Sequence, residues 1–509
     1  MGQETELKFV GPEGALMRLQ SSARLRRMAG KRRPQTKALK AIYFDTEDLK
    51  LRDAGLVLRV RNEGKGFVQT LKTVNGADVA SRLEIKSEVP EQAPSIKLIA
   101  DDGLRKRVAR LVRPKDLKPL FTVEMQRTTL LLSPRPGTEI EAAFDVGRIR
   151  HGKSVLPISE FELELVEGDV AALVACGREL TLDSGLTLFL QSKAERGYAL
   201  AKGAAEAAAT ADGLVLSSGA TADEAFGRIV GHCLRHLLGN WSAVTAARDA
   251  EGVHQMRVAL RRLRSAFSLF AGPFRTAMKD IESEVRWIAG VLGAARDLDV
   301  FQGDVFKPVL EAHGEDDRLR ELSTLVRARR RIAWHALLEA LESERFRKLV
   351  IDLAAVTFSR PWTNAAIGGV EAMVPAREFA YERLSARYAR ALKVGRKIAT
   401  LDEARRHALR IKLKKLRYAV DFFSSLFPRK RTQRFLGRLS SLQDVLGEMN
   451  DVAAAKALVG ELLIDQPERG GATYAAGVII GWHLGHLRDR VGRLKKRWNR
   501  FRDAKAPWA

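Results

Sequence analysis

Three charged side chains at alternate positions near the N-terminus, Glu4, Glu6 and Lys8, are the first residues in the chain suited to chemistry. In a β-strand, side chains alternate between the two faces, so these three would point to the same side of a sheet. A face with three charges cannot pack into an apolar core. Two carboxylates can hold a hard divalent cation, and a lysine can bind a phosphate oxygen. The triplet therefore predicts a metal-assisted phosphate site, with a solvated edge strand as the alternative.

The composition predicts a multidomain protein with a polyanionic partner. At 509 residues the chain is long enough for two or three domains, and 46% hydrophobic residues suffice for buried cores. The formal net charge of +25 calls for nucleic acid, polyphosphate or an anionic membrane. Two widely separated cysteines, Cys176 and Cys233, fit a reducing cytoplasm. No apolar signal segment is visible, and the longest apolar run, 475–484, is too short to span a bilayer. We therefore expect a soluble, cytoplasmic protein without a membrane partner.

The first 200 residues are dominated by short runs typical of strands, separated by turn residues. The runs predicted to be strands are Glu4–Val10, Lys40–Asp45, Leu56–Asn62, Gly66–Thr73, Ser81–Val89, Phe121–Leu132, Glu139–Arg148 and Ile158–Val166. Helical patterns intervene at Glu13–Met28, Pro94–Val112 and Asp169–Thr181. Eight strands in this rhythm predict an antiparallel barrel or a strongly curved sheet.

Charged residues alternate on several of these strands. Arg59 and Arg61 share one face of their strand, and Glu162 and Glu164 share one face of theirs. When five or more strands of a small sheet do this, we expect the strands to enclose a charged interior. Such an interior is stable only if its charges pair, or if a cation and a polyanion occupy it. The carboxylates expected to hold cations are Glu4, Glu6, Glu162 and Glu164. The cations expected to clamp phosphates are Lys8, Arg59, Arg61, Lys72, Arg127 and Lys193.

The ordered set of motifs over residues 1–200 resembles the CYTH, or triphosphate tunnel metalloenzyme, superfamily. The motifs are Glu-x-Glu-x-Lys at 4–8, Tyr43-Phe44-Asp45-Thr46, Leu-Arg-Val-Arg at 58–61, Glu-Leu-Glu at 162–164, and Ser192-Lys193 ahead of Arg196-Gly197-Tyr198. The resemblance implies an eight-stranded antiparallel tunnel that hydrolyses or rearranges triphosphates with Mg²⁺ or Mn²⁺. It implies metal ligation by Glu4, Glu6, Glu162 and Glu164, with Glu84 and Asp145 supporting the metal and its water. It also implies substrate binding by Lys8, Arg59, Arg61, Lys72, Arg127 and Lys193.

From Thr221 onward the pattern is helical and contains an internal repeat. The unit His254-x2-Arg257-x3-Arg261-Arg262-x-Arg264 recurs as His407-x2-Arg410-x3-Lys414-Lys415-x-Arg417, with every offset identical. Farther along, Leu292-Gly293-x2-Arg296-Asp297 matches Leu446-Gly447-x2-Asn450-Asp451. The repeat predicts two similar helical bundles related by duplication.

On a helical wheel, the histidine and the cations of each copy gather on one side. His254, Arg257, Arg261 and Arg264 fall within about 80° of one another, and Arg262 flanks the other side. The opposite face is apolar in both copies: Met256, Leu260, Leu263, Phe267 and Phe270, then Leu409, Leu413, Leu416, Val420 and Phe423. Each helix is therefore expected to bury one face and present cations on the other.

A solvated surface is the ordinary explanation of such a cationic face, and Asp297, Asp299 and Asp451 are candidates to pair with some of its cations. Like charges one and two turns apart cost helix stability unless anions lie beside them, and the arrangement occurs twice. We therefore favour an anionic ligand, with the histidines as pH-dependent phosphate donors rather than metal ligands.

These repeats resemble the CHAD domain, the conserved histidine α-helical domain, over about 221–505. The resemblance implies an all-α pair of bundles whose basic face binds inorganic polyphosphate. The second copy replaces the paired arginines with Lys414 and Lys415, and Arg296 with Asn450. Lysine is a point charge rather than a fork, so the second half-site is expected to bind phosphate less specifically.

The expected organisation is an α+β chain of two domains. Residues 1–203 form the β-tunnel, 204–220 an Ala-, Gly- and Ser-rich linker, and 221–505 the duplicated helical domain. The predicted function is metal-dependent hydrolysis of inorganic triphosphate to diphosphate and phosphate, by a protein that binds polyphosphate and associates with polyphosphate granules. The predicted catalytic residues are Glu4, Glu6, Lys8, Glu84 and Asp145, and Asp145 is also a predicted metal ligand.

Three alternatives stay open. The chain can be a polyphosphate-binding scaffold with an idle tunnel, or an enzyme acting on an organic triphosphate such as ATP or thiamine triphosphate. Specific nucleic-acid binding is disfavoured, because the basic rows lack interleaved aromatic residues for base stacking. The sequence does not determine the oligomeric state.

Overall fold

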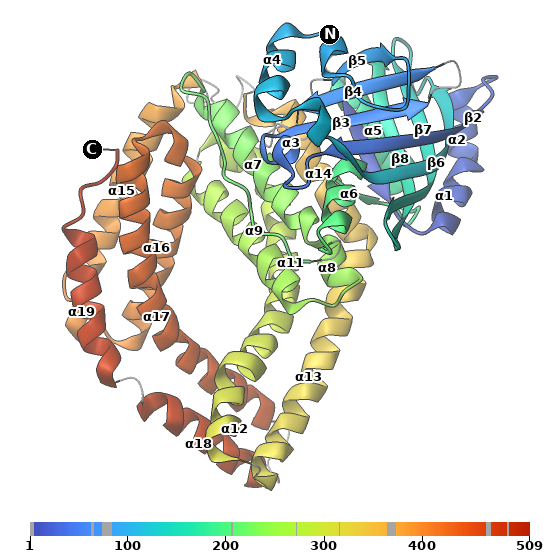
Figure 1. Cartoon of the computed structure of the whole chain (residues 1–509). Helices are drawn as coiled ribbons and strands as arrows, with labels where there is room; N and C mark the ends of the chain where they lie inside the picture. The colour runs from blue at the N-terminus through green and yellow to red at the C-terminus, as the bar shows by residue number, and fades with distance from the viewer. Residues whose placement is uncertain are drawn as a thin grey trace. The chain divides into compact units, whose positions relative to one another are not determined.

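A computed structural model describes residues 5–62, 66–73, 84–204, 207–270, 272–314, 316–363, 373–464, 470–485 and 488–508 (Figure 1). Glu4 and the first three residues of the predicted strand 81–89 lie outside the described residues. The chain forms two compact units. The first unit comprises Met1–Ala211, Leu234–Gln255 and Leu341–Ser359, and the second comprises Asp212–Cys233, Met256–Ala340 and Arg360–Ala509.

The first unit contains one antiparallel sheet of nine strands. Its strands are β1 (Glu6–Val10), β2 (Gln35–Asp45), β3 (Leu56–Asn62), β4 (Phe67–Thr73), β5 (Glu84–Val89), β6 (Lys118–Leu132), β7 (Glu139–His151), β8 (Ser154–Glu167) and β9 (Thr187–Leu188). The spatial order is β5-β4-β3-β2-β6-β7-β8-β1-β9. All eight predicted strands are therefore present, and β9 was not foreseen because two residues carry no periodicity.

The prediction of a closed eight-stranded barrel is wrong, because the described strands form an open sheet. No ladder joins β5 to β9 or β1 among the residues that the structure describes. Closure needs a ladder between the two edge strands, and one of these edges, β9, is only two residues long. The charged edge strand β5, Glu-Ile-Lys-Ser-Glu-Val, is of the kind that resists pairing with another strand.

Short helices pack on the sheet. They are α1 (Glu13–Gln20), α2 (Ala23–Ala29), α3 (Lys50–Asp53), α4 (Asp102–Leu111), α5 (Val170–Thr181) and α6 (Lys193–Ala201), and the first unit also contains α8 (Trp241–Thr245). Leu104 of α4 packs against a core that includes Leu58 of β3 and Leu71 of β4. Helix α6 packs on the face of β2 and β6 that also carries the charged residues, through Ala194 and Tyr198.

Helix α14 (Glu344–Ser359) also belongs to the first unit, although it lies far along the chain. It packs on α5, where Asp352 forms an ion pair with Arg178 and Arg347 Nε donates to the carbonyl of Leu182 at 2.9 Å. Gly177 of α5 in turn faces Leu7 of β1 closely enough that an added Cβ would lie 3.2 Å away. A helix from the second half of the chain thus supports the back of the strand that carries Glu6 and Lys8.

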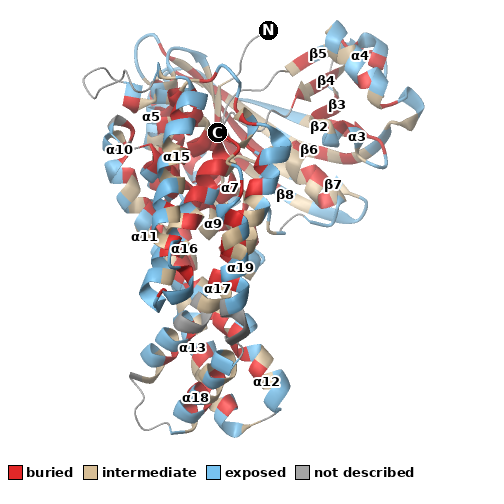
Figure 2. Ribbon diagram, turned by 90° about the vertical axis from the view of Figure 1, so that its left-hand side faces the viewer, coloured by how far each residue is buried: buried red, intermediate tan, exposed pale blue. Residues whose placement is uncertain are grey.

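The second unit is helical, as the sequence predicts. Helices α7 (Ala222–Gly239) and α9 (Ala250–Leu269) contribute to both units. The rest are α10 (Pro273–Ala277), α11 (Lys279–Val300), α12 (Lys307–His313), α13 (Asp317–Glu342), α15 (Ala376–Gly395), α16 (Glu403–Phe422), α17 (Arg429–Ile464), α18 (Gly470–Gly485) and α19 (Arg488–Arg502). The apolar faces predicted for the two repeated helices are buried throughout (Figure 2). Among the described residues, no helix has an apolar stretch long enough to cross a bilayer.

Part of the predicted linker is anchored rather than free. The backbone of Ala209 exchanges two hydrogen bonds of 2.9 Å with the side chain of Asn240. Leu216 is buried, and its N–H donates to Ser425 Oγ at 2.9 Å. The Ala- and Gly-rich composition of this segment does not predict these contacts. The domain boundaries themselves stay a prediction.

Candidate active site and cationic helical faces

The inner face of the sheet is lined with charge because the strand register brings the alternating residues together. Glu6 lies opposite Glu164, and Lys8 lies opposite Glu162, across the β1–β8 ladder. On the next ladders Asp145 lies opposite both Glu160 and Arg127. The charged side chains lining a cavity of about 310 Å³ are Glu6, Lys8, Arg59, Arg61, Lys72, Glu84, Lys86, Arg127, Glu141, Glu162, Glu164, Lys193 and Glu195. The structure thus gathers ten predicted site residues around one cavity, with Asp145 buried beside them.

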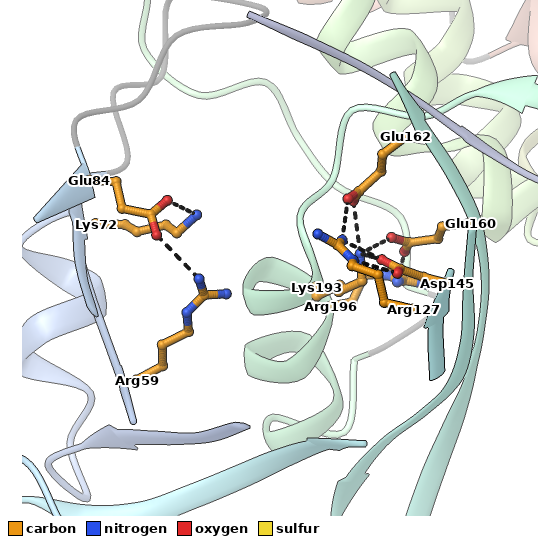
Figure 3. Close-up of polar contacts among 9 residues, drawn as sticks. All are labelled: Arg59, Lys72, Glu84, Arg127, Asp145, Glu160, Glu162, Lys193 and Arg196. Atoms are coloured by element: carbon orange, nitrogen blue, oxygen red, sulfur yellow. Dashed lines mark hydrogen bonds and ion pairs between the residues drawn. The ribbon is translucent and has the colours of Figure 1, made fainter. Parts of the chain in front are cut away.

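One wall of the cavity is an ion-pair cluster on β6, β7, β8 and α6, which we call the β8 cluster (Figure 3). Arg127 donates to Asp145 at 2.6 and 2.7 Å and to Glu162 at 2.5 Å. Lys193 Nζ lies 2.7 Å from Asp145, 2.5 Å from Glu160 and 2.8 Å from Glu162. Burial would raise the pKa of Glu162, but the charges of Lys193 and Arg127 hold that pKa well below its usual value.

The opposite wall is a smaller cluster on β3, β4 and β5 (Figure 3). Glu84 accepts from Arg59 at 3.2 Å and forms a second ion pair with Lys72. Burial acts to raise the pKa of Glu84, but the charges of Lys72 and Arg59 outweigh it, so the pKa of Glu84 is lowered. The predicted phosphate-binding cations therefore face each other across the cavity, each wall held by its own carboxylates.

Lys8 differs from the other cations of the cavity. It is 6% exposed, and its ammonium has no hydrogen bond or ion pair among the residues that the structure describes. Burial lowers the pKa of Lys8, although the charges of Glu160, Glu6 and Glu162 act in the other direction. A buried ammonium that has lost its water gains most from an anion that reaches it.

The carboxylates of the cavity fit a hard divalent cation. Glu6, Glu164 and Glu141 lie side by side in register on β1, β8 and β7, and facing side chains on adjacent strands lie about 5 Å apart at Cβ. Like charges directly opposite each other destabilise a sheet unless a cation lies between them. Oxygen atoms of Asp145, Glu160 and Glu162 also approach within 4.8 Å of one another, but Lys193 and Arg127 bind among them. By strand register, the row of Glu6, Glu164 and Glu141 is a second candidate for holding a metal ion. Glu4 lies outside the described residues.

Helix α6 places Lys193 in the cavity through several local contacts. Ser192 caps the helix, with a reciprocal hydrogen bond to Glu195. A Cβ at Gly197 would lie 2.1 Å from Phe121, so only glycine allows α6 to pack this closely on β6. Tyr198 donates to Asp45 at 3.0 Å, and burial raises the pKa of the Tyr198 hydroxyl. Asp45 and Tyr198 thus orient the site from behind, whereas Tyr43 of the same sequence motif lines the cavity.

The sequence reasoning passed over Glu160, Arg196 and Glu141. Glu160 is fully buried and binds both Lys193 and Arg196. The alternation of Glu162 and Glu164 extends back to position 160, so the signal for Glu160 was present. Glu141 shares a face with Asp145, four residues later on β7, and that spacing was equally readable.

The repeated helical faces are only partly cationic surfaces. Arg262 is 8% exposed and forms an ion pair with Asp421 of α16, so it contributes to the core of the second unit. Arg257 lies 3.4 Å from Asp297, as the pairing alternative anticipated, whereas Asp299 binds Arg330 at 2.6 Å. Arg264, Lys415 and Arg417 are exposed.

A group of arginines on α15 adds to these faces and was not foreseen. Within the part of the chain that the structure describes, Arg387 donates to neutral groups alone, the carbonyl of Lys415 at 3.1 Å and Ser268 Oγ at 3.3 Å. Burial, together with the charges of Arg390 and Arg383, lowers the pKa of Arg387 to about 10. Within the described residues, the buried Nε atoms of Arg261 and Arg383 have no hydrogen-bond partner. Among the described residues, the charges that act on Arg387 are thus those of other arginines.

Comparison with known proteins assigns a family to each of the two parts of the sequence. Residues 2–198 match the CYTH domain family and residues 228–460 match the CHAD domain family. An inorganic triphosphatase of Haemophilus influenzae is 34% identical over 166 residues, 31% of this chain and 44% of that protein. The chain therefore spans less than half the length of that relative. An uncharacterized protein of Mycobacterium tuberculosis is 27% identical over 410 residues, 76% of each chain.

A solved structure supports the helical assignment. The crystal structure of the CHAD domain from the plant Ricinus communis superposes with a TM-score of 0.51 at 31% identity, covering 59% of this chain and 98% of that one. Together, the two matched families and the charged cavity assign the two parts of the sequence. This chain belongs to the proteins in which a CYTH domain is followed by a CHAD domain.

Proposed function

We propose that the sheet domain hydrolyses inorganic triphosphate to diphosphate and phosphate with a divalent metal ion, Mg²⁺ or Mn²⁺, and that the helical domain binds inorganic polyphosphate. The match to the CYTH family and the resemblance to a triphosphatase support the reaction class. The cavity supports inorganic triphosphate as the substrate. A small phosphate chain is best held by cations from more than one side, and both walls of the cavity carry cations beside carboxylates suited to a metal ion.

The observation that carries the proposal is the buried Lys8, for which the described residues provide no ion pair or hydrogen bond. The other cations with measured contacts in the cavity, Arg59, Lys72, Arg127 and Lys193, are neutralised by carboxylates. Lys8 is buried among them with its charge uncompensated by direct contact within the described part of the chain. A phosphate group between the two walls supplies that compensation.

The chain's own residues contribute mainly positioning and charge neutralisation, which dominate phosphoryl transfer. Lys8, Arg127 and Lys193 bind phosphate oxygens from one wall, and Arg59 and Lys72 bind them from the other. Glu6, Glu164 and Glu141 would hold the metal, together with Glu162 when Arg127 and Lys193 turn to phosphate. When bound, such an ion lowers the pKa of a water molecule and neutralises phosphate charge.

For the helical domain, the cluster around Arg387 is the best-supported place for polyphosphate. Its cations are Arg383, Arg387 and Arg390 of α15, and Arg387 binds the backbone carbonyl of the repeat residue Lys415 on α16. Forked guanidinium groups match phosphate oxygens in pairs. A cytoplasmic location on polyphosphate granules follows from this ligand and stays a prediction.

The decisive experiment measures phosphate release from tripolyphosphate, ATP and long-chain polyphosphate, each with Mg²⁺ or Mn²⁺. It compares the wild type with Glu6→Gln, and uses Glu167→Gln, an exposed change on β8, as the matched control. Metal-dependent release from tripolyphosphate that is lost only in Glu6→Gln supports the proposal. Turnover confined to ATP indicates an organic-triphosphate enzyme. No turnover, with polyphosphate still bound, indicates a scaffold.

A further inference from the structure

A second cationic site lies between α17 and α19, away from the repeated motifs. A cavity of about 440 Å³ opens between these helices. Its polar lining is Gln433, Arg434, Arg438, Ser441, Arg497 and Arg500. We call it the arginine groove. Helix α19 begins at residue 488, beyond residue 460 where the match to the CHAD family ends.

The groove is held open by a packed aromatic core beneath it. Phe435 of α17 lies 5.5 Å from Phe501 of α19, and both rings contact Tyr388 of α15 at 5.6–5.7 Å. Trp498 packs against Gly395, where an added Cβ would lie 1.9 Å from the indole. With their apolar faces fixed in this way, the two helices have to present their arginines along the edge of the interface. Arg438 also donates to the carbonyl of Arg500 at 3.2 Å, which ties the helices together at the groove.

The groove concentrates positive charge without compensation. Among the described residues, no carboxylate lies within 4 Å of the guanidinium groups of Arg434, Arg438, Arg497 and Arg500. The ion pairs nearest in sequence, Arg493–Glu448 at 3.9 Å and Arg502–Asp503 at 2.9 Å, involve residues outside the lining. Like charges one turn apart on a helix are unfavourable, and here two such pairs face the same cavity. An anion in the groove removes that repulsion.

We propose that the arginine groove binds an inorganic oligophosphate. Guanidinium forks pair with phosphate oxygens two at a time, and four of them suit an anion with several phosphate groups. The α17 wall from Gln433 to Ser441 rises about 12 Å, which is long enough for more than one phosphate. Gly437 has no side chain and would have no atom within 4 Å of a Cβ, so the middle of the wall is clear for a chain.

Nucleic acid fits the groove less well. Single-stranded nucleic acid is held by aromatic side chains on which the bases stack. The lining of the groove contains no aromatic residue, and Phe435, Trp498 and Phe501 are buried in the core below it. The groove shares its ligand class with the helical part of the proposed function but none of its residues, and it is independent of hydrolysis in the sheet domain.

The test is a residue-resolved footprint on the full chain. Phenylglyoxal labels accessible arginines, and peptide mass spectrometry measures the labelling rate at each one. The probe is inorganic polyphosphate, used on the Glu6→Gln variant so that the probe is not consumed. We expect labelling of Arg434 and Arg438 to slow at least about fivefold with polyphosphate. Unchanged rates at both residues, while Arg387 is protected, overturn the proposal without affecting the proposed function.

Paired variants show whether the protection comes from the groove itself. In Arg497→Gln/Arg500→Gln the protection of Arg434 and Arg438 should disappear. In Lys495→Gln/Lys496→Gln it should persist, because these exposed lysines lie on the same helix, carry the same charge and do not line the groove. If both variants lose the protection of Arg434 and Arg438 equally, the protection is a diffuse electrostatic effect, which contradicts a site in the groove. If a DNA oligonucleotide with the same number of phosphates protects these arginines more strongly than polyphosphate does, the groove is not a site for inorganic oligophosphate.

Discussion

The ammonium of Lys193 lies 2.5 Å from a carboxylate oxygen of Glu160, and the other oxygen of Glu160 binds Arg196 of the same helix. One buried carboxylate on β8 thus holds both cations of α6. This arrangement determines where Lys193 enters the cavity, and it identifies Glu160 as a positioning residue for a phosphate-binding lysine.

Replacing Glu160 should loosen α6 before it changes the chemistry. Glu160→Gln leaves Arg196 without its carboxylate and weakens the hold on Lys193, which should cost about 3–5 kcal/mol of stability as for other broken buried pairs. The KM for tripolyphosphate should rise more than kcat falls, because Lys193 binds substrate. Thermal unfolding and steady-state kinetics measure the two effects. Glu167→Gln on the same strand is the control, and equal behaviour of the two variants would contradict this role.

Removing the buried ammonium of Lys8, which has no ion pair among the described residues, should affect activity far more than stability. Lys8→Met should lower kcat/KM for tripolyphosphate about 100-fold, as loss of a donor to developing charge does elsewhere. The ligand-free protein should be as stable as the wild type or slightly more stable, because a buried charge without a partner is costly. The comparison is with Lys153→Met, an exposed change in the β7–β8 turn. A large loss of stability in Lys8→Met would show that the lysine is structural.

A methyl group at Gly197 should push α6 away from the sheet. The added Cβ would lie 2.1 Å from the ring of Phe121, which belongs to the packed core with Tyr43. We expect Gly197→Ala to lower the unfolding temperature, by overpacking of about 1–3 kcal/mol, and to reduce activity through Lys193. Gly213→Ala, where a Cβ meets nothing within 4 Å, is the matched control. Wild-type kinetics in Gly197→Ala would rule out α6 as the element that positions the lysine.

Glu84 should make the stability of the wild type depend on acid pH. Its pKa is lowered in the folded state, so its contribution is fully present above the unfolded pKa near 4.5 and is lost as the pH falls through the lower folded value. Glu84→Gln should therefore be less stable than the wild type at pH 7, and the difference should shrink below pH 4.5. Denaturation at a series of pH values measures this. A difference that does not vary with pH would mean that the ion pairs with Arg59 and Lys72 contribute nothing.

The arginine cluster of the helical domain should trade stability for binding. The pKa of Arg387 is lowered to about 10, so its charged form opposes folding at neutral pH, and the penalty is relieved only as the pH rises above 10. Arg387→Gln should raise the unfolding temperature of the ligand-free chain and reduce the stabilisation that polyphosphate provides. The control is Arg377→Gln, an exposed position on the same helix. If Arg387→Gln lowers the unfolding temperature, the arginine is a structural residue.

Much of this molecule could be read from local periodicity. Alternation of charge placed Lys8, Arg59 and Glu162 on inner faces of strands, since side chains in a strand have a period of two. The apolar faces of α9 and α16 followed from helical periodicity in the same way. The order of the motifs also indicated both families.

The tertiary structure determined which side chains the residues on these faces contact. Only strand register and the packing of α6 could show that Glu160 binds Lys193, and only the contact of α9 with α16 could show that Arg262 pairs with Asp421. Whether a sheet closes depends on ladders between distant strands, and the described strands form an open sheet. The arginine groove likewise joins residues some sixty positions apart. Local sequence determines which face a residue occupies, whereas its partner depends on long-range packing that no local pattern encodes.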